Sequence, residues 1–306
     1  MTVPARTLRR REVYPGSVVD GRALGDGVGG RWGRRLQRLL VSAGEREEAE
    51  LERLIVTQPG ASRPNVAAMI SPKGGVGKTT LSFLAASVVA SRLAVRVIVV
   101  DANPDYGTLA ALAPDGLRCE RTLVDLLGEL DQVPTATHLN AYMSRLPSGV
   151  HLLAGPRDRE AMATLSPERY GELVAFLSTF YDLVVLDCGT GVGGPLARFA
   201  VDRADQVAIV STPEWVTSSV VLAALEELVS ERMTLAINMS HLRPGKQTRE
   251  LEERFRREGL RSPVVVPYDS QLGAMLDSAT YSLEALERPT RLAIKRIGLV
   301  VAERLV

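Results

Sequence analysis

The stretch from Ser71 to Thr80 reads SPKGGVGKTT and concentrates three glycines, two lysines and several hydroxyl side chains. An apolar run of strand length precedes it at 65–70, and an Ala-rich run with a helical period follows it at 81–90. Between a strand and a helix, glycines let backbone N–H groups turn onto an anion, and the helix N-terminus adds partial positive charge. The stretch therefore predicts a phosphate-binding loop, in which Lys78 reaches the β- and γ-phosphates and the Thr79 hydroxyl ligates Mg²⁺.

One position departs from the general phosphate-loop pattern G-x-x-x-x-G-K-S/T, because Pro72 stands where the first glycine is expected. The run from Lys73 to Thr79 instead resembles the deviant Walker A motif of the ParA/MinD family of ATPases. The resemblance implies that Lys73 reaches across a dimer to the phosphates bound by the other subunit. It also implies that ATP is held by the loop residues Gly74, Gly75, Val76, Gly77, Lys78, Thr79 and Thr80.

The composition of the 306 residues favours one large α/β domain with an appendage. Aromatic residues are scarce and Ala, Val and Leu are abundant, which suits a parallel sheet covered by helices better than a β-sandwich. We expect a doubly wound, mostly parallel sheet with helices on both faces in residues 61–306, the ATPase domain. Residues 1–60 form a separate N-terminal extension in this interpretation.

The two cysteines, Cys119 and Cys188, are far apart in the sequence and predict neither a disulfide framework nor a zinc site. No apolar run approaches the roughly 18 to 20 residues of a membrane span, and the N-terminus lacks the apolar core of a signal peptide. We therefore expect a cytoplasmic protein. Peripheral attachment to the nucleoid or to the inner face of the membrane stays open.

The N-terminal extension changes character along its length. Residues 1–30 are rich in Arg and Gly without an apolar period, which predicts a mobile basic leader. Residues 32–43 have the pattern of a basic amphipathic helix, Gly44 interrupts it, and an acidic helix is predicted over 45–55. The basic helix suits four partners: another protein, the side of the ATPase domain, a membrane surface or a nucleic acid.

A second nucleotide motif is predicted after the β-branched run at 94–100, which ends in Asp101. Ligands bind at the carboxyl ends of such strands, and the loop resembles the Asp-x-Asp-Pro motif of the family. The second carboxylate, which orients the attacking water in relatives, is replaced by Asn103. An amide holds water but takes up no negative charge, so we expect slow or partner-dependent hydrolysis, with Asp105 as a supporting candidate. A helix cap for Asp101 and a turn for Asp105 are the alternatives.

The third motif is the hydrophobic strand at 181–186, which delivers Asp187 to the same edge of the sheet. The pattern is that of a Walker B strand, whose carboxylate holds Mg²⁺ directly or through a water. The predicted metal ligands are therefore Thr79, Asp187 and Asp101. The predicted catalytic set is Lys73, Lys78, Asp101, Asn103 and Asp105.

The base of the nucleotide is expected near two later strands. Residues 233–238 end in Asn238, at the position where relatives recognise adenine through an amide, although a strand-end turn also explains it. Pro267, Tyr268 and Asp269 resemble the loop that closes over the base and ribose in the family. We expect these four residues to bind the nucleotide.

Two basic segments are candidates for contact with other molecules. Residues 246–261 carry several arginines, but the interleaved glutamates are spaced to form i,i+4 pairs that leave little net field for DNA. Residues 291–305 resemble the membrane-targeting tail of MinD. Gly298 weakens an isolated helix and Glu303 opposes anionic lipid, so a docked final helix is favoured.

The motifs occur in the order expected of a ParA/MinD ATPase, which implies an ATP-dependent dimerisation switch that positions, partitions or assembles cargo. The Arg-rich helix before the loop and the sequence DANPD at 101–105 resemble MinD-like ATPases of actinobacterial type VII secretion. The partners implied are a second copy of the chain and secretion or conjugation machinery. A DNA-binding partition ATPase and an ATP-binding scaffold with little hydrolysis are the alternatives.

Overall fold

A computed structural model of the chain describes residues 43–56, 63–93, 95–103, 107–156, 158, 160–161, 165–191, 193–228, 232–240, 245–257, 261 and 263–303. The candidate Asp105 lies outside these residues. So does the basic helix expected at 32–43, except for its last residue. The compact unit that contains the sheet extends over Arg46–Val306. It starts upstream of residue 61, and the domain division given above stays a prediction.

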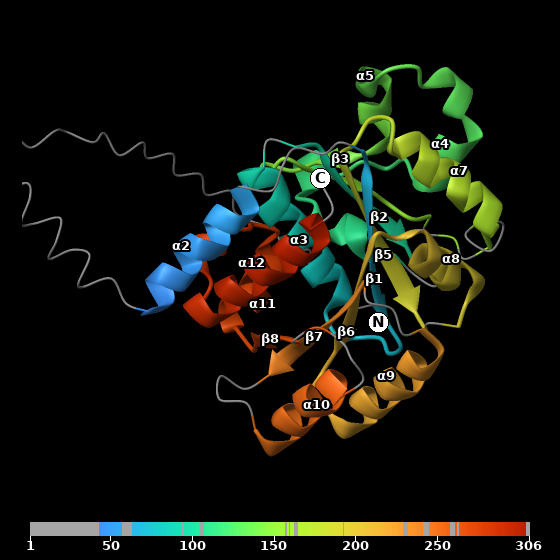
Figure 1. Ribbon diagram of the computed structural model, residues 1–306. Coiled ribbons are helices and arrows are strands. Elements are labelled where there is room, and N and C mark those ends of the chain that lie inside the picture. The colour runs from blue at the N-terminus through green and yellow to red at the C-terminus, as the bar shows by residue number, and fades with distance from the viewer. Residues whose placement is uncertain are drawn as a thin grey trace, which may run out of the picture. The chain divides into compact units, whose positions relative to one another are not determined.

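The unit is built on an eight-stranded sheet with the order β3-β4-β2-β5-β1-β6-β7-β8. All pairings are parallel except that of β3 with β4 at one edge (Figure 1). The strands are β1 (Asn65–Ser71), β2 (Val97–Ala102), β3 (Ser144–Arg145), β4 (Val150–Leu153), β5 (Leu183–Thr190), β6 (Gln206–Ser211), β7 (Met233–Ser240) and β8 (Val264–Pro267). The doubly wound α/β fold predicted from the sequence is confirmed.

Helices connect these strands and cover both faces of the sheet. They are α2 (Ala43–Val56), α3 (Lys78–Arg92), α4 (Leu123–Gly128), α5 (Ala136–Leu139), α7 (Pro167–Leu177), α8 (Pro195–Arg203), α9 (Trp215–Leu228), α10 (Lys246–Arg257), α11 (Ser270–Ser278) and α12 (Arg288–Ala302). Short 3₁₀ turns lie at Leu109–Leu112, Asp115–Leu117, Leu130–Gln132, Asn140–Tyr142 and Leu283–Ala285. Within the described chain, no helix is long and apolar enough to cross a membrane.

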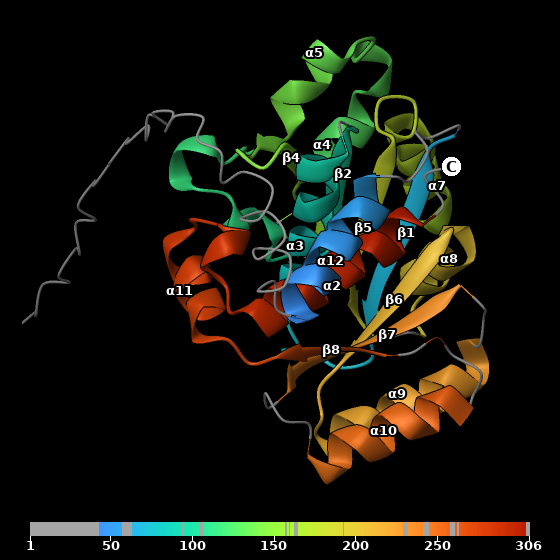
Figure 2. The ribbon, with the colours of Figure 1, turned by 60° about the vertical axis from the view of Figure 1, so that its left-hand side comes forward.

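The central strands are buried on both sides, which is why they read as continuous apolar runs rather than as alternating ones. One face is covered by α3 and α12, with α2 lying along the outside of α12 (Figure 2). The other face is covered by α4, α7, α8, α9 and α10. The carboxyl ends of the parallel strands therefore remain open at one edge, where the predicted motifs lie.

Helix α12 is docked, as the sequence favoured. Its residues Ile294, Ile297 and Val301 are buried against the sheet and α3. A Cβ at Gly298 would lie 2.9 Å from Cγ1 of Val88 in α3, so the glycine allows a close approach of the two helices. The residue that weakens α12 in isolation therefore permits its packing.

Local sequence signals account for the start of two helices but not for the course of α2. Thr122 caps α4 with a full capping box, and Ser166 caps α7 ahead of Pro167. The predicted break at Gly44 is wrong, because α2 begins at Ala43 and runs through it. A single glycine costs a helix only about 1 kcal/mol, so tertiary contacts of the helix outweigh it.

Candidate nucleotide-binding site

The glycine-rich loop between β1 and α3 is a tight turn held by its own side chains. Ser71 Oγ accepts a hydrogen bond from the Lys73 N–H at 3.3 Å and donates one to the Lys73 carbonyl at 2.8 Å. Gly75 and Gly77 have φ values of +77° and +82°, which favour glycine strongly. Gly77 is also the residue before α3, so the turn leads directly into the N-terminus of that helix.

The turn opens onto a cavity of about 360 Å³. Backbone N–H groups at the start of α3 have no helical partner, so this cavity suits an anion. Its lining consists of the loop and of residues from β5, β7 and the segment after β2, namely Lys73, Gly74, Gly75, Val76, Gly77, Lys78, Thr79, Thr80, Asn103, Thr108, Thr190 and Met239. The predicted loop residues are thus brought together around one space.

Lys78 points back toward the sheet and pairs with Asp187 at the end of β5. Its Nζ lies 2.8 Å from Asp187 Oδ1, and the two side chains are only 8% and 1% exposed. Ser82 Oγ lies 3.1 Å from the same carboxylate oxygen. Ser82 was not among the predicted site residues, although its position one helical turn after Lys78 places it on the same face of α3.

Asp101 is the second-last residue of β2 and lies directly opposite Asp187 in the strand register. Its two oxygens accept hydrogen bonds from the N–H groups of Asn103 and Leu109, each at 3.2 Å. Burial, followed by the charge of Asp187, raises the pKa of Asp101 to about 6. Two buried carboxylates that meet in this way would gain from a cation between them or beside them.

The loop after β2 passes closely over Asp101. A Cβ at Gly107 would lie 2.1 Å from Asp101 Oδ2, so this position leaves no room for a side chain. The loop then brings the Thr108 hydroxyl to 3.5 Å from that of Thr79. Thr108 was missed in the sequence, and so was Thr190 at the end of β5. The signal available for both was a hydroxyl in the segment that follows a predicted site aspartate, Asp101 for Thr108 and Asp187 for Thr190.

Lys73, the other lysine of the loop, lies on a different side of the turn. Its Nζ is 3.3 Å from Thr217 Oγ1 and 3.4 Å from Glu214 Oε2, at the start of α9. The side chain remains 45% exposed. Trp215 and Val216, which lie between these two partners in the sequence, are 65% and 64% exposed.

A smaller cavity of about 140 Å³ continues the site on the side of β7 and β8. Asn238 in its wall donates from Nδ2 to the Val76 carbonyl at 2.8 Å. A Cβ at Gly77 would lie 2.3 Å from that nitrogen. The position of Asn238 therefore leaves no room for a side chain at residue 77. The lining comprises Gly77, Thr80, Asn238, Met239, Pro267, Tyr268, Asp269, Leu272, Gly273 and Leu276.

Asp269 lies in this lining, but both of its oxygens are used by the backbone. Oδ1 accepts from the Gln271 N–H at 2.9 Å and caps α11, and Oδ2 accepts from the Glu287 N–H at 2.8 Å. Asp269 therefore holds the loop after β8 in place. Its contact with a nucleotide stays a prediction.

His151 and the charged residues of α10 have structural explanations. His151 shares a 2.6 Å hydrogen bond with the Tyr181 hydroxyl, and burial lowers the pKa of His151. On α10 the expected i,i+4 pairs are present: Lys246 with Glu250, Arg256 with Glu252 and Arg257 with Glu253, at 3.6, 3.8 and 2.7 Å. Arg256 and Arg257 are thus partly balanced by glutamates of their own helix.

Proteins that present a glycine-rich turn and a buried lysine at the carboxyl edge of a parallel sheet are P-loop nucleotide-binding proteins. The fold and the site place this chain in that class. The chain belongs to the AAA domain family, which matches residues 64–238, more than half of its length.

Solved structures extend the comparison to the fold. A ParA family ATPase from Chlorobium tepidum TLS is 20% identical, with a TM-score of 0.64 over 78% of this chain and 99% of that one. The septum site-determining protein MinD from Pyrococcus horikoshii OT3, complexed with Mg-ADP, is also 20% identical, with a TM-score of 0.57 over 78% of this chain and 95% of that one. The ParA/MinD resemblance is confirmed.

Two sequence relatives overlap with most of this chain but differ in how much of their own length is covered. The ESX-1 secretion-associated protein EspI of Mycobacterium tuberculosis is 28% identical over 256 residues, which are 79% of this chain and 37% of EspI. The antiactivator FleN of Pseudomonas aeruginosa is 28% identical over 256 residues, which are 79% of this chain and 88% of FleN. The chain therefore spans little more than a third of EspI and most of FleN.

Proposed function

We propose that this chain is an ATP-dependent dimerisation switch, in which bound ATP joins two copies and hydrolysis releases them. The observation that supports it best is the separation of the two lysines of the loop. Lys78 is buried inside its own subunit, whereas Lys73 lies at the start of α9 with 45% of its side chain exposed. A lysine on that surface can reach a phosphate held by a second copy.

The cavity residues fit a nucleoside triphosphate. The turn at Gly77 presents backbone N–H groups. The Lys78 ammonium, now paired with Asp187, would pair with the phosphates instead while its backbone stays in place. Asn238 and the loop containing Tyr268 border the smaller cavity, which would receive the base. The two cavities share Gly77, Thr80 and Met239, so one ligand would extend across both.

Mg²⁺ fits the edge of the site as an ion shared with the ligand. Within the described residues, no three His, Cys, Asp or Glu side chains are grouped so that they alone would hold a metal. Asp187, Asp101 and the Thr79 hydroxyl would therefore hold it together with phosphate oxygens and water, the usual way in which Mg²⁺ is bound. When bound, the ion neutralises charge on the phosphates.

Slow hydrolysis is part of this proposal. Asn103 lines the phosphate cavity, and its amide orients a water but accepts no proton. Asp105, the second candidate for this role, lies outside the described residues. An ATP-binding scaffold that hydrolyses little is therefore the second candidate function, and the amide of Asn103 is the observation that favours it.

Secretion machinery is the cargo that we propose, and the similarity to EspI supports it. DNA is a weaker candidate, because Arg256 and Arg257 of α10 are paired with glutamates on the same helix. A membrane tail is also weaker, because Arg291 and Lys295 of α12 are already paired with Glu48. Location at the nucleoid or at the inner face of the membrane would follow from the partner.

Light scattering with ATP and Mg²⁺ tests the switch. We expect the wild type to double its mass with ATP but not with ADP, and Lys73→Ala to stay monomeric while it still binds ADP. Lys246→Ala is the matched control, since this exposed lysine pairs with Glu250 on α10 and should dimerise normally. ATP-dependent dimers of Lys73→Ala, or a wild type whose mass does not respond to ATP, would contradict the proposal.

A further inference from the structure

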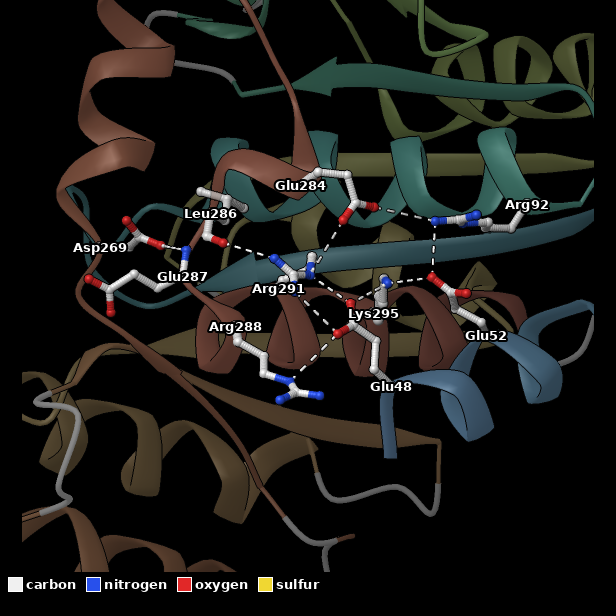
Figure 3. Close-up of polar contacts among 10 residues, drawn as sticks. All are labelled: Glu48, Glu52, Arg92, Asp269, Glu284, Leu286, Glu287, Arg288, Arg291 and Lys295. Carbon is white, nitrogen blue, oxygen red and sulfur yellow. Dashed lines mark hydrogen bonds and ion pairs between the residues drawn. The ribbon is translucent and has the colours of Figure 1, made fainter. Parts of the chain in front are cut away.

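Helix α12 carries a buried lysine, and the carboxylates that balance its charge come from α2, near the start of the compact unit in the sequence. The Lys295 side chain is 1% exposed, and its Nζ lies 2.7 Å from Glu48 Oε1 and 2.5 Å from Glu52 Oε1 of α2 (Figure 3). A buried ammonium without a partner costs several kcal/mol, so α12 can pack in this way only while α2 is docked.

Glu48 also holds the neighbouring Arg291 at two points. Arg291 donates from Nε to Glu48 Oε1 at 2.6 Å and from Nη2 to Oε2 at 3.2 Å. Hydrogen bonds from Arg291, and then from Lys295, lower the pKa of Glu48 to about 2, despite the opposing effect of burial. The paired geometry fixes the plane of the guanidinium group.

The third nitrogen of Arg291 faces away from α2, toward the segment before α12. Nη1 donates to the Leu286 carbonyl at 3.0 Å. The next residue, Glu287, donates its N–H to Asp269 Oδ2 at 2.8 Å. Asp269 in turn borders the smaller cavity and caps α11. Figure 3 shows these contacts as one continuous series from α2 to the loop after β8.

A second set of ion pairs joins α2, the segment before α12 and the C-terminal end of α3. Arg92, in the last turn of α3, lies 3.0 Å from Glu52 and 3.6 Å from Glu284. Glu284 is 3.8 Å from Arg291. These pairs are more exposed and individually weak, but they keep the 283–287 segment between α2 and α3.

We propose that α2 is a positioning element of the base pocket. Glu48 orients Arg291, Arg291 holds the 286–287 segment, and that segment fixes Asp269 and the loop that would enclose a nucleotide base. The inference rests on the proposed nucleotide site. It adds that a helix upstream of the P-loop, without contact with the nucleotide, sets the affinity for the base but not for the phosphates.

The test separates the two parts of the ligand. Glu48→Gln keeps the shape of the side chain and removes its charge, and Arg291→Lys keeps the positive charge but loses the fork that reaches Leu286. Isothermal titration with ADP and with pyrophosphate, each with Mg²⁺, measures the two affinities. Both variants should bind ADP about tenfold more weakly, a change usual for coupled networks, and pyrophosphate within about twofold of the wild type.

Glu47→Gln is the matched control. Glu47 is on the same helix, but its partner in α12 is Arg296 rather than Arg291, the residue that holds the Leu286 carbonyl. It should leave both affinities unchanged. Equal losses for ADP and pyrophosphate in Glu48→Gln and Arg291→Lys, or no loss of ADP, would overturn the inference. A wild type that binds neither ligand would overturn the proposed function as well.

Discussion

Two buried lysines, Lys78 in α3 and Lys295 in α12, show that similar burial serves different ends. Lys78 has one carboxylate partner and borders a cavity of about 360 Å³, so a phosphate can replace that partner. Lys295 has two carboxylate partners from α2 and lines none of the cavities described above. The first lysine holds its charge ready for a ligand, whereas the second holds two ends of the fold together.

Removing the charge of Lys78 should have the largest effect, and the quantity affected should be the affinity for nucleotide. We expect Lys78→Ala to weaken ADP·Mg²⁺ binding roughly a thousandfold, because the variant loses a charge-assisted contact in a desolvated site. Isothermal titration measures the loss. Binding within tenfold of the wild type would contradict the assignment of Lys78 as a phosphate ligand.

Removing the charge of Lys295 should instead fall on stability. Lys295→Ala leaves Glu48 and Glu52 facing each other without the ammonium, and we expect the free energy of unfolding to drop by about 3 kcal/mol. Urea unfolding of the ligand-free protein measures it, with Lys246→Ala as an exposed control that should change little. If Lys295→Ala were as stable as that control, the pairing with α2 would contribute nothing to the fold.

Acid should weaken the α2 contacts selectively, with the smallest effect of the three. The pKa of Glu48 is lowered in the folded state to about 2 from an ordinary value of 4.5. Its stabilisation is therefore complete above about pH 4.5 and is lost as the pH falls toward 2. The difference in unfolding free energy between wild type and Glu48→Gln should be constant from pH 7 to pH 5 and smaller at pH 3. A difference that persists unchanged at pH 3 would contradict the role of this carboxylate charge.

Much of the phosphate side of the site was predictable because its signals are local. Strand, glycine turn and helix follow one another within a few residues, and parallel strands place their carboxyl ends on one edge. That rule is enough to bring Asp101 and Asp187 opposite each other, as the register confirms. The capping residues Thr122 and Ser166 likewise act within the first turn of the helix that follows them.

The contacts of α2 were not predictable in this way. Glu48 and Lys295 are 247 positions apart, and the charges of each helix equally suit solvent or pairs along the same helix. The basic residues of α12 gave the segment a resemblance to a membrane-targeting tail beside the favoured docked helix, and only the structure shows that Arg288, Arg291, Lys295 and Arg296 all pair with glutamates of α2. Asp269 similarly resembled a ligand, while its oxygens are used by backbone N–H groups. Whether a charged side chain faces solvent, a ligand or another helix depends on which helices pack together. A local sequence pattern does not indicate which helices do so.

The span between Glu48 and Lys295 also bears on the order in which the protein is made. Synthesis proceeds from the N-terminus at roughly 5 to 20 residues per second, so α2 leaves the ribosome many seconds before α12. During that interval its glutamates have neither Arg291 nor Lys295 to meet. The sheet strands can assemble as they emerge, but the α2 contacts can close only after α12 has been synthesised. The first described helix of the chain is thus among the last to find its place.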